Sequence, residues 1–168
     1  MKKIFALLLV VSLFLSFGLT AFAAGSPVKQ VEGPDSSTIR SPGIASMGVF
    51  NSAGEKIGSI PNYLISKWSI YYANALGTED KESFLTAYDG VKSVTDKLVK
   101  DFFWLGVSKS YEFPDGFAYC EYPFTCAGEN VKLTVNGKEM ELTKGEGNNY
   151  TAKMTEFGPV TISCDLSA

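Results

Sequence analysis

The richest set of side chains for recognising a ligand lies at 111–124, where the sequence reads YEFPDGFAYCEYPF. Flat apolar rings with phenolic hydroxyls suit a sugar ring or an extended peptide, so this segment is predicted to form a binding platform. The platform would consist of six aromatic residues: Tyr111, Phe113, Phe117, Tyr119, Tyr122 and Phe124. The first four share one face of a predicted hairpin, and the favoured interpretation of these four is that they belong to the core under the helices. Tyr122 and Phe124 have the opposite parity and are then expected to be exposed.

Three carboxylates, Glu112, Asp115 and Glu121, accompany these rings. A pair of carboxylates beside aromatic rings is the equipment of a glycoside hydrolase. Acids are also common on the exposed face of a strand. The sequence therefore favours a non-catalytic surface, with a small carboxylate-dependent hydrolase as the alternative.

The chain contains no histidine. Histidine is the usual general base near neutral pH and the commonest metal ligand. Its absence excludes Ser-His-Asp and Cys-His nucleophiles in their ordinary form, as well as zinc sites built on histidine. No calcium loop, phosphate loop or dinucleotide motif is present. We therefore expect no catalytic residues, no metal and no cofactor.

The three cysteines, Cys120, Cys126 and Cys164, lie in the last third of the chain. In an oxidising compartment one pair can persist as a disulfide, and the odd count leaves one thiol over. Cys120–Cys164 is the preferred pair, with Cys126 as the alternative partner of Cys164. Either bond would close a loop of roughly 40 residues, worth about 3–4 kcal/mol. The other possibility is that all three are buried, reduced thiols.

The N-terminus has the three parts of a signal peptide. Lys2 and Lys3 precede an uncharged stretch at 4–19, and Ala21 and Ala23 fit the exit site, so cleavage is expected after Ala23. The uncharged stretch is shorter than the roughly 20 residues that span a bilayer. The signal resembles those of exported proteins of low-GC Gram-positive bacteria. We therefore expect a secreted or envelope-located protein with no membrane insertion after cleavage.

Cleavage would leave an acidic chain. Residues 24–168 keep 13 of the 15 basic residues and all 18 acidic ones, for a net charge of −5. Affinity for phosphate comes from Lys and Arg, so nucleic acid is excluded as a partner. Residues 24–43 are predicted to be a flexible lead-in, and residues 44–168 a single domain.

The first half of this domain is predicted to hold a hairpin and then helices. Two short apolar runs, 44–50 and 55–60, flank a turn-forming cluster. Apolar residues at helical spacing over about 62–105 then predict two or three amphipathic helices. Gly77 is expected to end the first of them, and Thr78 to cap the second.

From about 107 to 165 the apolar period changes to two, which predicts an antiparallel β-meander. Pro114-Asp115-Gly116 is expected to turn its first hairpin, and Asn136-Gly137 its second. In the second hairpin, Leu133 is expected to oppose Met140, Val131 to oppose Leu142, and Lys132 to oppose Glu141. Two further strands are predicted at 150–154 and 160–164.

The predicted fold class is α+β, with the helices packed on one face of the meander. A helical hairpin followed by a small β-sandwich is the alternative. The order of helices and curved sheet resembles the cystatin-like and NTF2-like folds, although the strands usual between the helices of the latter are missing. The stretch 131–165 resembles the closing strands of a bacterial immunoglobulin-like module. Such resemblances imply a fold and no function.

Together these observations predict an exported bacterial protein that acts as a non-catalytic binding or envelope-associated module. Its expected ligand is a carbohydrate or a peptide held by the aromatic segment.

Overall fold

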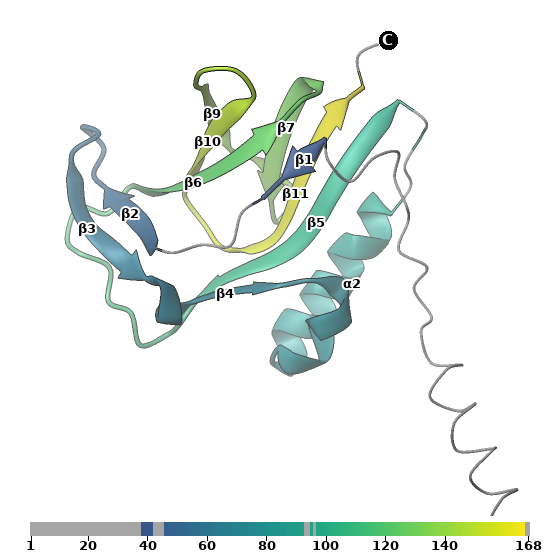
Figure 1. Cartoon of the computed structure of the whole chain (residues 1–168). Helices are drawn as coiled ribbons and strands as arrows, with labels where there is room; N and C mark the ends of the chain where they lie inside the picture. Colours follow the sequence, from purple (N-terminus) through teal and green to yellow (C-terminus); the bar gives the residue numbers. More distant parts are fainter. Residues whose placement is uncertain (1–37, 42–45, 93–94, 96, 167–168) are drawn as a thin grey trace, which may run out of the picture. The chain divides into compact units, whose positions relative to one another are not determined.

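The computed structural model describes residues 38–41, 46–92, 95 and 97–166. They all fall within one compact unit, Gly33–Ala168. These residues form two antiparallel sheets and one α-helix (Figure 1). The predicted signal peptide and most of the predicted lead-in lie outside the described residues. Within the described part of the chain, no helix is long and apolar enough to cross a membrane.

The first sheet has six strands, in the order β3-β2-β6-β10-β9, with β1 also paired to β6. The strands are β1 (Ile39–Arg40), β2 (Ser46–Phe50), β3 (Lys56–Pro61), β6 (Tyr119–Cys126), β9 (Glu141–Lys144) and β10 (Asn149–Met154). The β2–β3 hairpin confirms the pair of strands predicted at 44–50 and 55–60.

The second sheet has five strands, in the order β4-β5-β11-β7-β8. The strands are β4 (Ile65–Trp68), β5 (Leu98–Val107), β7 (Glu129–Val135), β8 (Lys138–Glu139) and β11 (Gly158–Asp165). Two 3-10 helices, η1 (Asn62–Leu64) and η2 (Ile70–Ala75), flank β4, and α2 (Thr78–Val91) follows them.

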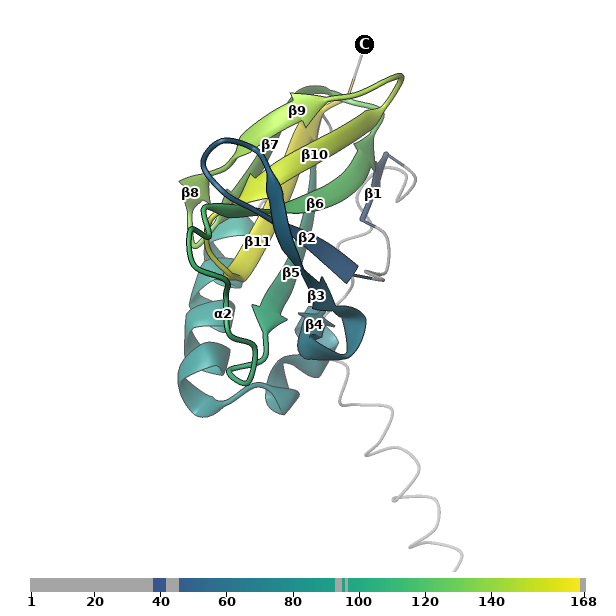
Figure 2. The ribbon, with the colours of Figure 1, turned by 90° about the vertical axis from the view of Figure 1, so that its left-hand side faces the viewer.

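The two sheets bury their inner faces against each other in a single core. Alternate residues of each strand point inward, as the pleat requires. The rings of Phe103 on β5 and Tyr122 on β6 meet across the layers, with centroids 5.8 Å apart. Figure 2 looks onto the first sheet, with β5, β11 and α2 behind it. Strands β6, β7, β10 and β11 all contribute fully buried side chains to this core.

Helix α2 forms a third layer on the outer face of the five-stranded sheet. Phe84 is fully buried there, with its ring centroid 4.9 Å from that of Phe102 and 6.4 Å from that of Trp104. The expected apolar helix face is therefore confirmed over Thr78–Val91. The N-cap residue is Gly77 rather than Thr78.

The other predicted helices are wrong. Residues 62–76 form η1, β4 and η2, and β5 takes up Leu98–Val107. Strand β5 is covered on both faces: Phe103 and Leu105 point into the core, while Phe102 and Trp104 lie under α2. A strand buried on both faces is apolar without alternation, so it is easily mistaken for a helix.

The predicted single meander is also wrong, because successive strands change sheets. The turn at Pro114-Asp115-Gly116 forms, with the Phe117 N–H donating to the Pro114 carbonyl at 3.1 Å. No strands flank it, however, and residues 109–118 are a loop that leads into β6. Strands β10 and β11 do occupy the positions predicted at 150–154 and 160–164.

The hairpin at Asn136-Gly137 is confirmed, but it is short. Thr134 pairs with Glu139, and the Met140 N–H donates to the Leu133 carbonyl at 2.9 Å, as the predicted register requires. After Met140 the chain crosses to the other sheet. The expected Val131–Leu142 and Lys132–Glu141 pairs are therefore wrong. Lys132 forms an ion pair with Glu139 at 3.6 Å instead.

Candidate functional site

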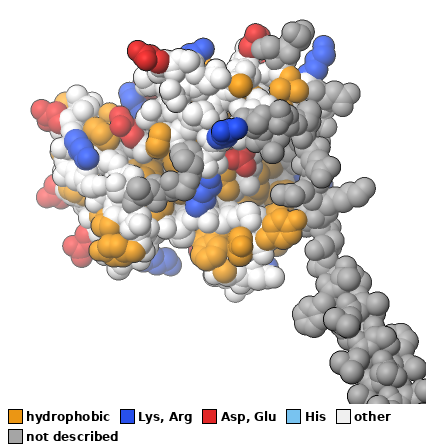
Figure 3. All heavy atoms as spheres, viewed as in Figure 1, with side chains coloured by type: hydrophobic (Ala, Val, Ile, Leu, Met, Phe, Trp, Pro, Cys, Tyr) orange, Lys and Arg blue, Asp and Glu red, His pale blue; other side chains and the backbone are white. Residues whose placement is uncertain are grey.

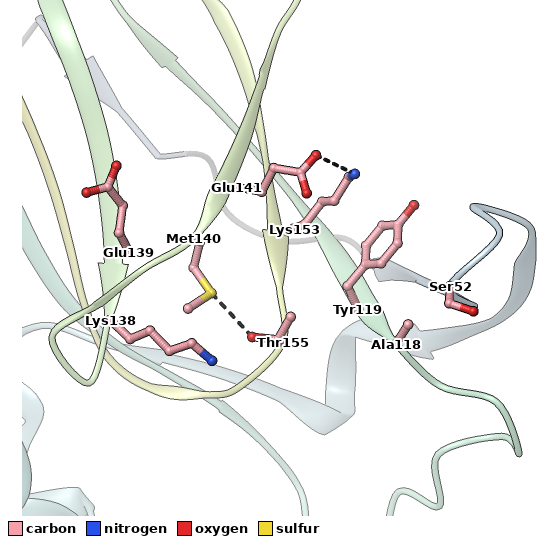
Figure 4. Close-up of a pocket in the computed structure, with 9 residues that line it drawn as sticks. All are labelled: Ser52, Ala118, Tyr119, Lys138, Glu139, Met140, Glu141, Lys153 and Thr155. Carbon is pink, nitrogen blue, oxygen red and sulfur yellow. Dashed lines mark hydrogen bonds and ion pairs between the residues drawn. The ribbon is translucent and has the colours of Figure 1, made fainter.

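A pocket of about 330 Å³ opens where the edge strands of the two sheets come together. Strand β8 is the edge of one sheet and β9 the edge of the other, and the buried Met140 joins them. The start of β6, the end of β10 and the β2–β3 turn complete the pocket (Figure 4). Its lining residues are Ser52, Ala118, Tyr119, Lys138, Glu139, Met140, Glu141, Lys153 and Thr155.

Tyr119 provides the aromatic wall of the pocket. It lies on the outer face of β6, in register with Phe50 of β2, and the two rings stack with centroids 5.3 Å apart and planes 6° apart. The Lys153 ammonium lies over the same ring, 5.3 Å from its centroid. Strand parity explains the placement: Cys120, which follows Tyr119, and Val49, which precedes Phe50, both point into the core.

The charged wall of the pocket is built on strand pairing. Lys153 of β10 is in register with Glu141 on one side and with Glu121 on the other. Its Nζ donates to Glu141 Oε1 at 2.6 Å, and this hydrogen bond raises the pKa of Lys153 above its usual value. Lys138 forms an ion pair with Glu156 at 3.4 Å. Exposed ion pairs are worth little, so a ligand can replace them at small cost.

The floor of the pocket is apolar. Met140 is 4% exposed, and the Thr155 hydroxyl contacts its sulfur at 3.6 Å. Methionine side chains adapt to the shape of what they contact. An aromatic wall, paired charges and a thioether floor equip the pocket for recognition, and its lining holds hydroxyls but no thiol.

The structure separates the six predicted binding aromatics. Tyr122 and Phe124 are 0% and 2% exposed, so the expectation that they face solvent is wrong. Tyr119 does lie on the opposite face from Tyr122 and Phe124, as predicted. The inner and outer faces are the reverse of the prediction, because β6 turns Tyr122 and Phe124 into the core and Tyr119 outward. Tyr119 alone among the six lines the pocket.

Tyr111, Phe113 and Phe117 form a half-buried cluster beside the core. The Phe113 ring lies 5.0 Å from that of Tyr111 and 4.3 Å from that of Phe117, by centroid. The Tyr111 hydroxyl donates to the Ser59 carbonyl of β3 at 3.3 Å. These contacts fasten the 109–118 loop to the sheet, so the three rings hold the loop in place.

The three predicted carboxylates lie on two different kinds of segment. Glu112 and Asp115 are exposed in the loop, whereas Glu121 is on β6 opposite Lys153.

The cysteines are three unbridged, buried thiols. Cys126 and Cys164 lie next to each other, close enough for a hydrogen bond between their side chains. Cys120 is not near this pair: it neighbours Val49 and Met154 across the strands. The structure therefore brings Cys164 together with the alternative partner, Cys126, and not with the preferred one.

The sequence analysis missed Lys153, Glu141, Lys138 and Ser52 of the pocket. Each is ordinary in type and isolated in sequence. The pairing of β10 with β6 and β9 brings Lys153 and Glu141 together, and the pairing of β2 with β6 brings the turn that holds Ser52. Lys138 comes from β8 in the other sheet. No local signal announces pairing between distant strands. The one usable hint was the alternation of 150–154, which places Lys153 on an outer face.

A second polar group, also missed, joins β4, β5 and the residue that follows β1. Lys67 of β4 donates to Ser41 Oγ at 2.6 Å, and this hydroxyl donates to Asp101 Oδ2 at 2.8 Å. Burial lowers the pKa of Lys67, and Asp101 opposes this effect in part. The adjacent Tyr122 hydroxyl is buried without a hydrogen bond among the described residues. Burial raises the pKa of Tyr122, and the nearby Ser41 hydroxyl offsets this only partly.

Exposed tyrosines mark a third region, around η1 and η2. Tyr63 is 79% exposed, Tyr71 55% and Tyr72 59%. In Figure 3, hydrophobic side chains gather along the lower rim of the face in view, the side on which Figure 1 places β4 and α2. Tyr72 falls in the stretch for which an amphipathic helix was predicted, and η2 presents its ring to solvent instead.

Among the described residues, no group of three or more acidic or cysteine side chains is arranged to hold a metal ion. Comparison with models of protein families, with curated protein sequences and with solved structures finds no match to this chain.

Proposed function

We propose that this chain is a non-catalytic binding module of a bacterium, secreted or held in the cell envelope, and that the pocket around Tyr119 is its ligand site. One observation carries the proposal: the same pocket holds the Tyr119 ring, which stacks on Phe50, and the ion pair between Lys153 and Glu141. The signal-like N-terminus, with its Ala21 and Ala23 exit site, supports the location.

An extended peptide fits this site better than a sugar. A sugar ring needs a free aromatic face, but Phe50 stacks on Tyr119 and the Lys153 ammonium lies over the same ring. The pocket also runs along two edge strands, β8 and β9, each paired on one side only within its sheet. A sheet edge offers main-chain groups to an added strand. Lysines and glutamates of the lining then match the charges of alternate peptide side chains.

The test is a titration of the full chain, followed by NMR, with short capped peptides of alternating charged and aliphatic residues. Chitotetraose and maltotetraose serve as the carbohydrate arm. We expect peptides to shift the amide signals of β8, β9 and Tyr119. Replacing Tyr119 by Ala should weaken binding about tenfold, equivalent to about 1.4 kcal/mol. Tyr63→Ala, which removes an exposed ring outside the pocket, is the control and should leave affinity unchanged.

Other results would overturn parts of the proposal. Binding of an oligosaccharide at Tyr119 would replace the ligand class but keep the site. Equal losses from Tyr119→Ala and Tyr63→Ala, or no binding in either arm, would remove the site. Turnover of a peptide or glycoside, abolished by Glu112→Gln with Glu121→Gln in a folded protein, would make the chain a hydrolase.

A further inference from the structure

Cys126 and Cys164 face each other across the sandwich. Cys126 is the last residue of β6, and Cys164 is the penultimate residue of β11, in the opposite sheet. Both are 1% exposed. Their side chains are within hydrogen-bonding reach of each other. The two thiols thus already contact one another inside the core.

The chain path explains why the sheets are close at this point. Facing sheets usually lie about 10 Å apart, whereas a disulfide needs Cα atoms about 4.4–6.8 Å apart. Immediately after Cys126 the chain crosses to the other sheet, where Glu129 pairs with Asp165, the neighbour of Cys164. The crossing is tight: a Cβ added at Gly128 would lie 2.5 Å from Cys164 Sγ and 2.5 Å from the Asp165 carbonyl oxygen.

Cys120 cannot replace either partner. It lies on the same face of β6 as Cys126, six residues earlier, which corresponds to about 20 Å along a strand. Its neighbours across the strands are Val49 and Met154, both fully buried and apolar. Burial raises the pKa of Cys120 to about 12, so its thiolate is scarce at neutral pH. Cys120 is therefore expected to stay a buried, unreactive thiol.

We propose that Cys126 and Cys164 become a disulfide that joins the two sheets when the chain folds in an oxidising compartment. The inference rests on the proposed location outside the membrane. The two thiols lose two protons and two electrons, and a disulfide-bearing oxidant takes up the electrons and becomes two thiols. The S–S bond replaces the contact between the thiols, and no other bond of the chain is broken.

We expect the bond to form during folding, because both side chains are only 1% exposed once the core has closed. Burial also raises the pKa of Cys164, and Cys126 beside it contributes in the same direction. The thiolate is the attacking species in disulfide exchange, so a folded, reduced protein should oxidise slowly. An unfolded chain has ordinary, accessible thiols and should be oxidised as the strands assemble.

The first test is disulfide mapping of the full chain, refolded with reduced and oxidised glutathione and then alkylated under denaturing conditions. Trypsin alone leaves Cys120 and Cys126 in one peptide, because residues 110–131 contain no Lys or Arg. Adding a glutamate-specific protease cuts after Glu121 and separates them. We expect residues 122–129 linked to residues 157–168, with Cys120 alkylated. Three alkylated cysteines, or a bridge containing Cys120, would overturn the assignment.

The second test is the stability of matched cysteine variants. The oxidised protein with Cys120→Ala should melt at least roughly 10 °C above its own reduced form. Cys126→Ala and Cys164→Ala should show no such difference between oxidising and reducing buffer. If the Cys120→Ala protein melted at the same temperature in oxidising and reducing buffer, whereas the other two variants did not, the proposal would be contradicted. The refolding is done in vitro, so it tests the pairing of the cysteines and not the cellular location. If the bridge forms in vitro but the protein is found in the cytosol, the proposed location is wrong and the proposed pairing stands.

Discussion

Lys67 shows how a single side chain can shape the interior of this sandwich. Its parity on β4 directs it inward, where a lysine is rarely found without a partner. Ser41 supplies that partner and passes the interaction on to Asp101, and the Phe103 ring lies 4.2 Å from the ammonium. The group is therefore satisfied, although burial still disfavours its charge.

Replacing Lys67 by Met should change the pH dependence of stability. Burial lowers the native pKa of Lys67 below its ordinary value of 10.5, so the folded chain releases this proton before the unfolded chain does. Between the two pKa values the unfolded state holds more protons, and the free energy of unfolding must rise with pH. Wild type should therefore gain stability relative to Lys67→Met as pH climbs from 7 towards 10.

Urea unfolding at several pH values would measure this difference. The series should stop near pH 10, because the raised pKa of Tyr122 acts in the opposite direction above that point. At pH 7 the substitution should change stability by no more than about 1 kcal/mol, since removing the desolvated charge offsets the lost hydrogen bonds. A difference that stays constant with pH would show that Lys67 titrates normally.

At the residue scale, the sequence predicted which side chains share a face of β6, but not which of the two faces points into the core. Tyr119 and Tyr122 were correctly placed on opposite faces of one strand. Which face is inner depends on what covers it, and that is settled by the opposite sheet, where Phe103 of β5 meets Tyr122. The sequence around 111–124 contains no information about those partners.

Among the elements, those defined by local chemistry were predictable. The β7–β8 turn forms because Asn136 and Gly137 adopt positive φ angles of 50° and 79°, which these residue types tolerate. Helix α2 forms where an apolar stripe follows Gly77. Strand β5 was missed because α2 covers its outer face, so both of its faces became apolar.

The contact between α2 and β5 should be tested with Phe84→Ala. Phe84 is fully buried against Phe102 and Trp104, so its loss should lower the free energy of unfolding by about 3–5 kcal/mol. Thr86→Ala, two positions along on an exposed part of α2, is the control and should change it by less than about 0.5 kcal/mol. Chemical denaturation of both variants gives the comparison. A small effect of Phe84→Ala would mean that the helix is not a firmly packed layer.

At the scale of the whole molecule, one core ties both sheets together. Phe103 and Tyr122 meet across it, and the chain passes between the sheets at Gly128 and again at Met140. The class was predictable in part: antiparallel strands and an amphipathic helix are confirmed. The division into two sheets was not, because apolar alternation identifies strands without identifying their neighbours.

A shared core predicts a single unfolding transition. Both tryptophans, Trp68 and Trp104, lie on strands of the five-stranded sheet. Their fluorescence therefore reports on that sheet, whereas far-ultraviolet circular dichroism reports on every strand. We expect the two signals to give the same urea midpoint. Two separate midpoints would show that the sheets unfold independently.

The position of β11 has a consequence for how the protein is made. This strand lies between β5 and β7 and is the last strand along the chain. A nascent polypeptide that has not yet delivered residues 158–165 has no centre for its second sheet. The first sheet can pair earlier, because all of its strands precede residue 158. A chain that ends before β11 should therefore leave β5 and β7 without their common neighbour and fail to complete the core.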